Sequence, residues 1–268
     1  MRGKVVIITG ASSGIGKACA LEFAKRGANV VLAARNKEKL ELVIEELKEI
    51  NKNNIAVQCD VSKEEDCRKL IEETIKKYQK IDVLINNAGI SMRALFNETA
   101  LSVIKKVMDI NFWGTVCCTK FALPYLLKSQ GSVVGVSSIA GYLGLPARTG
   151  YSASKYAMQG FLDALRTENL KTGLHVMVAC PGFTASNIRN TALTNDGSEQ
   201  GETPRDEEKM MTAEEVAKEI VDGVIKRKRT LVLTTEGKLA VFLGKLFPKF
   251  IEKQVFNKMV KEPDSPLK

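Results

Sequence analysis

The feature that most constrains the fold is the alternation of short β-branched runs with longer stretches of helical periodicity along 268 residues. Valine- and isoleucine-rich runs bounded by polar residues predict strands buried on both faces, with covering helices between them. This alternation favours a parallel sheet, because each parallel connection must cross over the sheet. The expected strands are Lys4–Ile8, Asn29–Ala34, Ile55–Cys59, Asp82–Asn86, Ser132–Ser137, His175–Cys180 and Thr230–Thr234. The expected helices lie near residues 14–26, 37–51, 63–79, 99–128, 151–171 and 212–228.

The chain has no internal repeat and no linker, so we predict one α/β domain over residues 1–236. Its architecture should be a Rossmann-like, doubly wound parallel sheet of about seven strands with helices on both faces. The first apolar run, Val5 to Ile8, is too short for a signal peptide or a spanning helix, which favours a cytoplasmic location. Six scattered cysteines favour reduced core thiols, and the single His175 gives no support for a metal site.

A glycine-rich turn follows the first expected strand, in the sequence Thr9-Gly10-Ala11-Ser12-Ser13-Gly14-Ile15-Gly16. Such glycines let a strand turn sharply into a helix and let the backbone approach a pyrophosphate. The free N–H groups and the positive dipole end of that helix then attract the phosphates. The turn therefore predicts a dinucleotide site with contacts from Gly10, Ser12, Ser13, Gly14, Ile15 and Gly16.

The end of the second expected strand indicates which dinucleotide is preferred. NAD-specific sites generally carry an acidic residue there, which holds the ribose 2′-hydroxyl. This chain has Ala34 followed by Arg35, and a guanidinium can hold a 2′-phosphate through charge-assisted hydrogen bonds. NADP(H) is therefore the preferred cofactor, with NAD(H) as the alternative. After the third strand, Asp60 is placed to accept a hydrogen bond from an adenine amine, and Ser62 with Glu65 predicts the N-cap of the next helix.

Tyr151 and Lys155 are four residues apart and share one face of an expected helix. A phenol with an ordinary pKa of about 10 is a poor acid–base catalyst at neutral pH. A nearby ammonium, together with the positive nicotinamide of the oxidised cofactor, should lower that pKa. Ser138 ends the fifth expected strand, where its hydroxyl is placed to hold a substrate oxygen as charge develops. The three side chains therefore predict proton transfer to a carbonyl oxygen or from an alcohol.

Together these motifs resemble those of the short-chain dehydrogenase/reductase family, in its common Tyr-x-x-x-Lys type, over essentially residues 3–235. The resemblance implies that Asn111 holds a water in a proton relay. It also implies that Asn86-Asn87-Ala88-Gly89 supports the cofactor and the central sheet. The segment Pro181-Gly182-Phe183-Thr184-Ala185-Ser186 should grip the nicotinamide amide, with Ser186 in place of the usual threonine.

The resemblance therefore extends the set of site residues. The implied catalytic residues are Asn111, Ser138, Tyr151 and Lys155. The further implied cofactor contacts are Asp60, Val61, Asn87, Ala88, Gly89, Tyr151, Lys155, Pro181, Gly182, Thr184 and Ser186. Many NADPH-using members carry a basic residue where this chain has Ser13, so the NADPH preference depends mainly on Arg35.

What the resemblance implies for function is an NADP(H)-dependent oxidoreductase that interconverts a ketone and a secondary alcohol. NADPH would deliver hydride to the carbonyl carbon while Tyr151 protonates the oxygen, Ser138 hydrogen-bonds it and Lys155 binds the nicotinamide ribose. The alternatives are a 3-oxoacyl thioester reductase and a non-catalytic cofactor-sensing protein. Family members commonly pair through the helices that match 99–128 and 151–171, so a homodimer or homotetramer is expected.

Two segments outside this pattern bear on the substrate. Residues 187–211 are largely polar, and a loop of that length predicts a substrate lid. Residues 237–268 form an amphipathic, basic C-terminal extension, with leucines and phenylalanines on one face, lysines on another, and a break at Pro248.

Three arrangements of this extension are open: packing on the domain or a partner subunit, roofing the substrate site, or peripheral contact with a membrane interface. From Lys226 to the C-terminus, 11 Lys and Arg outnumber 4 Asp and Glu. No nucleic-acid motif accompanies these charges, so nucleic acid is not an expected partner. Family members that act on steroids and lipids often carry such additions, which favours a hydrophobic substrate.

Overall fold

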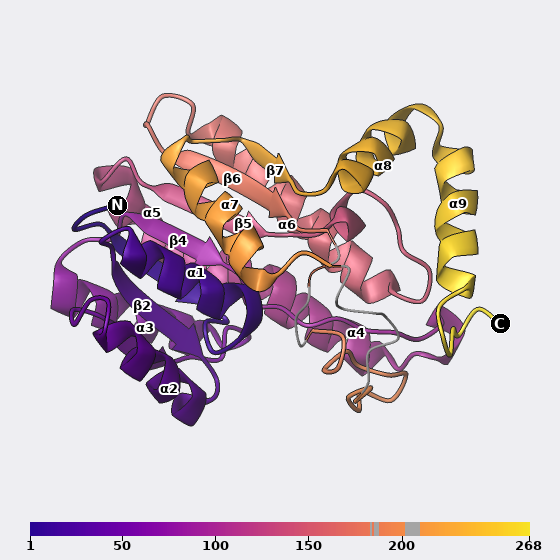
Figure 1. Ribbon diagram of the computed structural model, residues 1–268, viewed down its shortest axis with the longest axis horizontal. Coiled ribbons are helices and arrows are strands. Elements are labelled where there is room, and N and C mark those ends of the chain that lie inside the picture. Colours follow the sequence, from indigo (N-terminus) through magenta and orange to yellow (C-terminus); the bar gives the residue numbers. More distant parts are fainter. Residues whose placement is uncertain (183, 185–187, 202–209) are drawn as a thin grey trace.

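The computed structural model describes residues 1–182, 184, 188–201 and 210–268. Its strands form one parallel sheet, and their order among the described residues is β3-β2-β1-β4-β5-β6-β7. The strands are β1 (Val5–Thr9), β2 (Asn29–Ala34), β3 (Ile55–Gln58), β4 (Val83–Asn86), β5 (Ser132–Val136), β6 (His175–Cys180) and β7 (Thr230–Val232). The predicted doubly wound Rossmann-like fold is confirmed, and the expected strands are placed to within two residues (Figure 1).

The helices alternate with the strands along the chain, as the sequence pattern predicted. Short turns are η1 (Phe96–Glu98), the π-helical η2 (Asp109–Trp113) and η3 (Ile139–Gly141). The α-helices are α1 (Gly14–Lys25), α2 (Lys37–Lys48), α3 (Glu64–Tyr78), α4 (Leu101–Met108), α5 (Gly114–Lys128), α6 (Thr149–Glu168), α7 (Ala213–Ile225), α8 (Thr235–Leu246) and α9 (Pro248–Val260).

Alternate residues of the central strands face opposite layers, because successive side chains of a strand point to opposite faces. Val6 and Ile8 of β1 pack in the cluster that includes side chains of α1, α2 and α7. Val5 and Ile7 pack in the second cluster, with side chains of α3, α5 and α6. All five residues of β1 are buried, so the strand is covered by helices on both sides.

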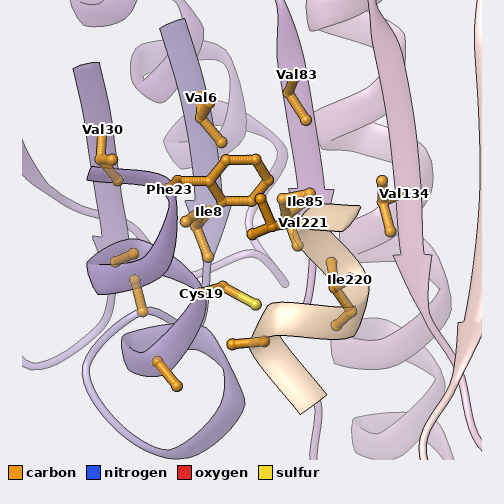
Figure 2. Close-up of a cluster of buried hydrophobic side chains, with 14 of the residues drawn as sticks. Val6, Ile8, Cys19, Phe23, Val30, Val83, Ile85, Val134, Ile220 and Val221 are labelled. Carbon is orange, nitrogen blue, oxygen red and sulfur yellow. The ribbon is translucent and has the colours of Figure 1, made fainter. Parts of the chain in front are cut away.

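Phe23 of α1 fills the centre of the first layer. Its ring is fully buried, and Figure 2 shows it among Val6, Ile8, Ile85 and Val221. Burying an aromatic side chain of this size contributes a large share of the stability of a core. The packing of α1 against α7 therefore fixes the helix that follows the glycine-rich turn.

The strand order changes direction between β1 and β4, which pair directly with each other. From β1 the chain adds β2 and β3 on one side, whereas β5, β6 and β7 extend on the other. Ligands of open α/β sheets bind outside the carboxyl ends of the strands at such a switch point. The turn after β1 and the Asn86-Asn87-Ala88-Gly89 segment after β4 meet there.

The C-terminal extension consists of α8 and α9. Figure 1 shows both helices, in yellow, at the end of the molecule away from α1 and α2. The break predicted at Pro248 is confirmed: α8 ends at Leu246, and Pro248 is the first residue of α9. Within the described residues, no helix combines the length and the apolar character that crossing a bilayer requires.

Candidate functional site

The glycine-rich turn is held in a conformation that larger residues would disrupt. Gly10 has a φ of +66°, and a Cβ there would lie 2.9 Å from the Cα of Ala88. A Cβ on Gly16 would collide with the carbonyl oxygen of Gly10. Asn87 holds the turn from β4, since its Nδ2 donates to the carbonyl oxygens of Thr9 (2.9 Å) and Gly10 (3.2 Å). The tight backbone approach predicted for a pyrophosphate site is therefore present.

The N-terminus of α1 lies open at this turn. Ser13 is the N-cap residue, and none of the side chains that the structure describes caps the helix there. The N–H groups of the first helical turn therefore keep their capacity to bind an anion. The donors and the space around them fit the diphosphate of a dinucleotide.

A cavity of about 750 Å³ runs from this turn along the carboxyl ends of β2, β3 and β4. Most of the predicted cofactor contacts line it, whereas Gly16 lies beneath the turn, packed against Gly10 and Asn87. The predicted residues in the lining are Gly10, Ser12, Ser13, Gly14, Ile15, Arg35, Asp60, Val61, Asn87, Ala88 and Gly89.

The end of the cavity next to β2 is basic. Arg35 is exposed there, and Lys39 from the first turn of α2 lines the same wall. The N-cap Asn36 accepts a hydrogen bond from the Lys39 backbone N–H at 2.7 Å, which fixes this turn beside Arg35. Lys39 was missed by the sequence reasoning, although its position in the first turn of the expected helix that follows Arg35 was a usable signal. The two cations together suit a phosphate on the adenosine ribose.

Asp60 lies in the cavity wall, but Ser62 does not cap the following helix. The Ser62 hydroxyl and backbone N–H both donate to Asp60 Oδ1, at 2.7 and 3.1 Å. Helix α3 begins at Glu64 with Lys63 as its N-cap, and no capping side chain is found there among the described residues. The predicted N-cap was therefore wrong, because α3 begins one residue later than expected and the Ser62 hydroxyl is turned toward the Asp60 carboxylate.

Tyr151, Ser138 and Lys155 come together beyond the far end of this cavity. Tyr151 lies in the first turn of α6, and Ser138 follows β5 directly. Lys155 is 3% exposed; its Nζ lies 5.7 Å from the centre of the Tyr151 ring and donates to the carbonyl oxygen of Val136 at 2.9 Å. Burial lowers the pKa of Lys155 to about 8, so the ammonium remains the main form at neutral pH.

The acidity of the phenol in the protein alone is set mainly by burial. Burial raises the pKa of Tyr151, while a hydrogen bond with Ser138 and the charge of Arg148 act in the opposite direction. Lys155 is not among the groups that act on this pKa, so the lowering expected from its ammonium together with the oxidised nicotinamide stays a prediction for the complex. In the protein alone the ammonium is directed at the Val136 carbonyl, and the loss of hydration outweighs the nearby polar groups.

Asn111 is fully buried in the π-helical turn η2 and supports the catalytic helix. Its Oδ1 accepts from the Ile90 N–H (2.8 Å), and its Nδ2 donates to the Ile90 carbonyl and to Ser154 Oγ, both at 2.9 Å. Ser154 in turn donates to the Tyr151 carbonyl at 2.7 Å. Gly89 adjoins this group, since a Cβ there would lie 3.2 Å from Asn111 Oδ1 and 3.5 Å from Lys155 Nζ. These contacts join the cavity to the catalytic helix.

The segment after β6 is described in part. Gly182 packs against Thr234, and Thr184 is buried with its hydroxyl donating to the Gly182 carbonyl at 3.2 Å. Ser186, the predicted amide contact, lies outside the described residues, as do Phe183 and Ala185. The cavity lining does not include Pro181, Gly182 or Thr184, nor Ser138, Tyr151, Lys155 or Asn111.

The segment predicted as a lid contacts the cavity over its described part. Ile188, Thr191, Leu193 and Glu199 contribute to the lining. Backbone hydrogen bonds join Leu193 to its neighbours: its N–H donates to Ser91 (2.9 Å), and its carbonyl accepts from Arg93 (2.8 Å). The Leu193 side chain is buried in a small cluster that Tyr151 packs against. Residues 187 and 202–209 of the predicted lid lie outside the described part of the chain.

The extension packs beside the segment that follows Ser138. Gly237 and Gly244 let α8 approach Ile139 and Leu143 closely. A second hollow of about 740 Å³ separates α9 from the start of α6. It is lined by Gly144, Leu145, Pro146, Thr149, Ser152, Lys249, Glu252, Lys253 and Phe256.

Cysteines and the histidine contribute to the core of the protein. The six thiols are free, and five of them are buried. His175 is held by Ser132 Oγ (3.0 Å) and the Lys228 carbonyl (2.9 Å), and burial lowers its pKa. In the part of the chain that the structure describes, three or more His, Cys, Asp or Glu side chains do not gather in a metal-binding arrangement.

Comparison with known proteins extends over most of the chain. The family model of short chain dehydrogenases matches residues 4–197. Dehydrogenase/reductase SDR family member 7B of Danio rerio is 38% identical over 256 residues, covering 92% of this chain and 83% of its own. The 11-beta-hydroxysteroid dehydrogenase 1A of Arabidopsis thaliana is 38% identical over 258 residues, covering 93% of this chain and 74% of its own.

Solved structures share the fold at lower sequence identity. A short chain dehydrogenase/reductase from Burkholderia phymatum, in complex with NAD, has a TM-score of 0.82 and 23% identity, covering 93% of this chain and 95% of that one. An alcohol dehydrogenase from Thermococcus sibiricus, complexed with 5-hydroxy-NADP, has a TM-score of 0.75 and 23% identity. It covers 87% of this chain and 96% of that one.

Proposed function

The chain belongs to the short-chain dehydrogenase family and is an oxidoreductase acting on CH–OH and C=O groups, and from that premise we propose that it reduces a ketone to a secondary alcohol with NADPH. The observation that carries the proposal is the grouping of Tyr151, Ser138 and buried Lys155 beside a cavity suited to a dinucleotide. Hydrophobic ketones are the proposed substrates.

The preference for NADPH is supported at the adenosine end of the cavity. Arg35 and Lys39 supply two cations there, and Ala34 occupies the place of the acidic residue that favours NAD. Two cations can share a 2′-phosphate, whereas a 2′-hydroxyl gains little from them. NADH remains the alternative cofactor, and the reaction rates with NADPH and NADH should be compared.

The chain's own residues supply the proton and the positioning. A dihydronicotinamide held in this cavity would supply the hydride for the carbonyl carbon. Tyr151 donates its phenolic proton to the carbonyl oxygen, and the Ser138 hydroxyl donates a hydrogen bond to that oxygen as negative charge develops. Lys155 binds the nicotinamide ribose, and its charge then favours the phenolate that Tyr151 becomes. Asn111 holds the start of α6 through Ser154. As the family resemblance implies, it would also hold a water that returns a proton to Tyr151.

The proposal of a hydrophobic substrate is supported by the surroundings of Tyr151. Met92, Val103 and Leu193 form an apolar cluster against it. Helix α8 packs on the segment after Ser138, where it can form a wall of the substrate site. The hydroxysteroid dehydrogenase names among the relatives agree with a bulky apolar ketone as substrate.

Self-association and membrane contact are further proposals. Trp113 and Tyr156 are 52% and 47% exposed on η2 and α6, which suits a homodimer or homotetramer formed through the α5–α6 face.

The outer face of α8 and α9 combines exposed Phe242, Phe247 and Phe250 with lysines, which suits peripheral contact with an anionic membrane facing the cytoplasm. Sedimentation of the protein alone, and with anionic or neutral liposomes, tests the two proposals separately.

A panel of ketones and alcohols assayed in parallel with NADPH and NADH tests the function. We expect higher kcat/KM with NADPH and with bulky apolar ketones than with short 3-oxoacyl thioesters. A preference for the thioesters would favour the alternative 3-oxoacyl reductase. Cofactor binding without turnover of any member of the panel would favour a cofactor-sensing protein.

A further inference from the structure

A carboxylate is buried in the C-terminal tail that follows α9. Glu262 is 6% exposed, whereas its neighbours Lys261 and Asp264 are exposed. Burying a carboxylate costs free energy unless cations and hydrogen bonds compensate for the lost hydration. Two arginines do so here: Nη2 of Arg93 and Nη2 of Arg148 each lie 3.7 Å from Glu262 Oε2.

Both arginines are themselves largely buried and hold the tail by further contacts. Their side chains are 8% and 12% exposed. Arg93 Nη2 donates to the carbonyl oxygen of Pro263 at 2.7 Å, and Arg148 Nη1 lies 3.8 Å from the sulfur of buried Met259. The group of Glu262, Arg93 and Arg148, here named the tail cluster, therefore joins the extension to two earlier segments of the chain.

Arg148 connects the tail cluster to the catalytic helix. It is the N-cap residue of α6, and its carbonyl oxygen accepts from the Ser152 N–H at 2.8 Å. Tyr151 follows three residues later, in the first helical turn. The preceding Ala147 has a φ of +56°, a left-handed conformation that a non-glycine residue keeps only where the surroundings fix it.

Arg93 connects the same cluster to the other side of Tyr151. Its backbone N–H donates to the Leu193 carbonyl at 2.8 Å, and Leu193 packs in the apolar cluster against the Tyr151 ring. The next residue, Ala94, donates its N–H to the Ala147 carbonyl at 3.0 Å. The two arginine-bearing segments are therefore bound to each other as well as to Glu262.

We propose that Glu262 is a positioning residue for the ketone reduction: through Arg148 and Arg93 it fixes the start of α6 and the electrostatic surroundings of Tyr151. The inference rests on the function proposed above. In this arrangement the C-terminal tail is part of the active-site structure, because a carboxylate that pairs with Arg148 comes from residue 262.

The electrostatic part of this role has a definite sign. The groups that face the Tyr151 phenol are Ser138 after β5, Cys180 at the end of β6, Arg148 before α6 and Lys155 on α6 itself. The charge of Arg148 lowers the pKa of the phenol, and the Glu262 carboxylate offsets that charge. Removing the carboxylate should make the phenol more acidic, whereas removing the guanidinium should make it less acidic.

Alcohol oxidation requires the phenolate, so the test is the pH dependence of kcat/KM for that reaction. It is measured in Glu262→Gln, in Arg148→Gln and in the double variant. We expect the acidic limb to move down by about half a pH unit in Glu262→Gln and up by about as much in Arg148→Gln, the size expected of one unit charge in partly hydrated surroundings. The double variant should return close to the wild-type limb. Asp264→Asn removes the same charge from an exposed position two residues away and should leave the profile unchanged.

Hydrogen exchange supplies a readout that needs no turnover. Amides of residues 145–152 should exchange about fivefold faster or more in Glu262→Gln than in Asp264→Asn, because the start of α6 loses an anchor. Equal exchange in these two variants would overturn the positioning role. Acidic limbs of the pH profile that shift in the same direction in Glu262→Gln and Arg148→Gln would also overturn the positioning role. A wild-type protein that turns over no alcohol or ketone would defeat the proposed function, while the exchange comparison would still decide whether Glu262 anchors α6.

Discussion

The cofactor end of the molecule and its C-terminal extension are built on different principles. At the cofactor end, Gly10, Gly16 and Asn87 fix the backbone through close contacts with one another and with Thr9 and Ala88, where β1 and β4 end. In the extension, Leu239, Phe242, Leu246, Phe247, Phe250 and Phe256 are exposed on α8 and α9. The comparison teaches that the first region is fixed by backbone atoms packed too closely to admit a side chain. The second region depends on a few ion pairs and on whatever covers its apolar face.

The largest effect is expected where the backbone is most confined. Gly16→Ala places a methyl group against the Gly10 carbonyl and Asn87, so the turn must open and the dinucleotide site is lost. We expect binding of NADPH, measured by its fluorescence, to weaken by roughly 100-fold or more, beyond one charge-assisted contact. Gly160→Ala is the matched control, because a Cβ there meets open space on helix α6. Near-normal binding by Gly16→Ala would show that the turn is not confined.

Two phenylalanine substitutions compare how much the buried core and the C-terminal extension contribute to the free energy of unfolding. Phe23→Ala empties the centre of the first core layer and should lower the free energy of unfolding by about 3–5 kcal/mol. Phe242→Ala removes a ring that is 61% exposed on α8 and should change it by less than about 0.5 kcal/mol. Chemical denaturation of both variants measures the difference. A large loss in Phe242→Ala would mean that α8 is buried in solution, most simply by a second subunit.

Charge at the rim of the cavity should affect cofactor choice more than stability. Arg35→Ala and Lys39→Ala should each raise KM for NADPH, by roughly 10- to 100-fold for Arg35, because a charge-assisted hydrogen bond contributes about 1.5–3 kcal/mol. KM for NADH should stay within about twofold in both variants, since its ribose carries no 2′-phosphate. Lys37→Ala, on the same helix but outside the cavity lining, is the control. Equal losses with both cofactors would contradict a 2′-phosphate site.

The smallest effect is expected from His175, which joins β6 to β5 in the core. Burial lowers its pKa in the folded protein, so the unfolded chain binds more protons as the pH falls. Stability should therefore decline as the pH drops below about 6.5, the ordinary histidine value. Thermal unfolding between neutral and mildly acidic pH measures the decline, and His175→Asn should lessen it. An identical decline in that variant would assign it to carboxylates such as buried Asp82.

Much of the fold could be predicted because the strands and the glycine turn are encoded locally. The β1 run and the turn after it need no distant partner to be recognised. The predicted helix 99–128 was wrong in one respect, since η2 interrupts it around Asn111. Nothing in Met-Asp-Ile-Asn-Phe-Trp distinguishes a π turn from an α turn, and the distinction comes from the contacts of Asn111 with Ile90 and Ser154.

Other features of the site depend on positions that sequence spacing does not define. The i,i+4 spacing places Tyr151 and Lys155 on one face, but it does not give the direction of the ammonium, which is set by the Val136 carbonyl. In the protein alone burial raises the pKa of the phenol, and the lowering predicted for the complex with the oxidised cofactor stays a prediction. The pairing of Glu262 with Arg93 and Arg148 is equally hidden, because it joins residues more than 100 positions apart that share no motif.

The central claim is that the Tyr151 phenol exchanges a proton with the substrate oxygen beside a bound nicotinamide. Its most direct measurement compares wild type and Tyr151→Phe for ketone reduction at saturating NADPH, with NADPH affinity measured separately. Loss of a general acid should lower kcat by about 100- to 10,000-fold while NADPH affinity stays within a few-fold of wild type. A variant that keeps more than about a third of the wild-type kcat would contradict the account, because a phenyl ring cannot donate that proton.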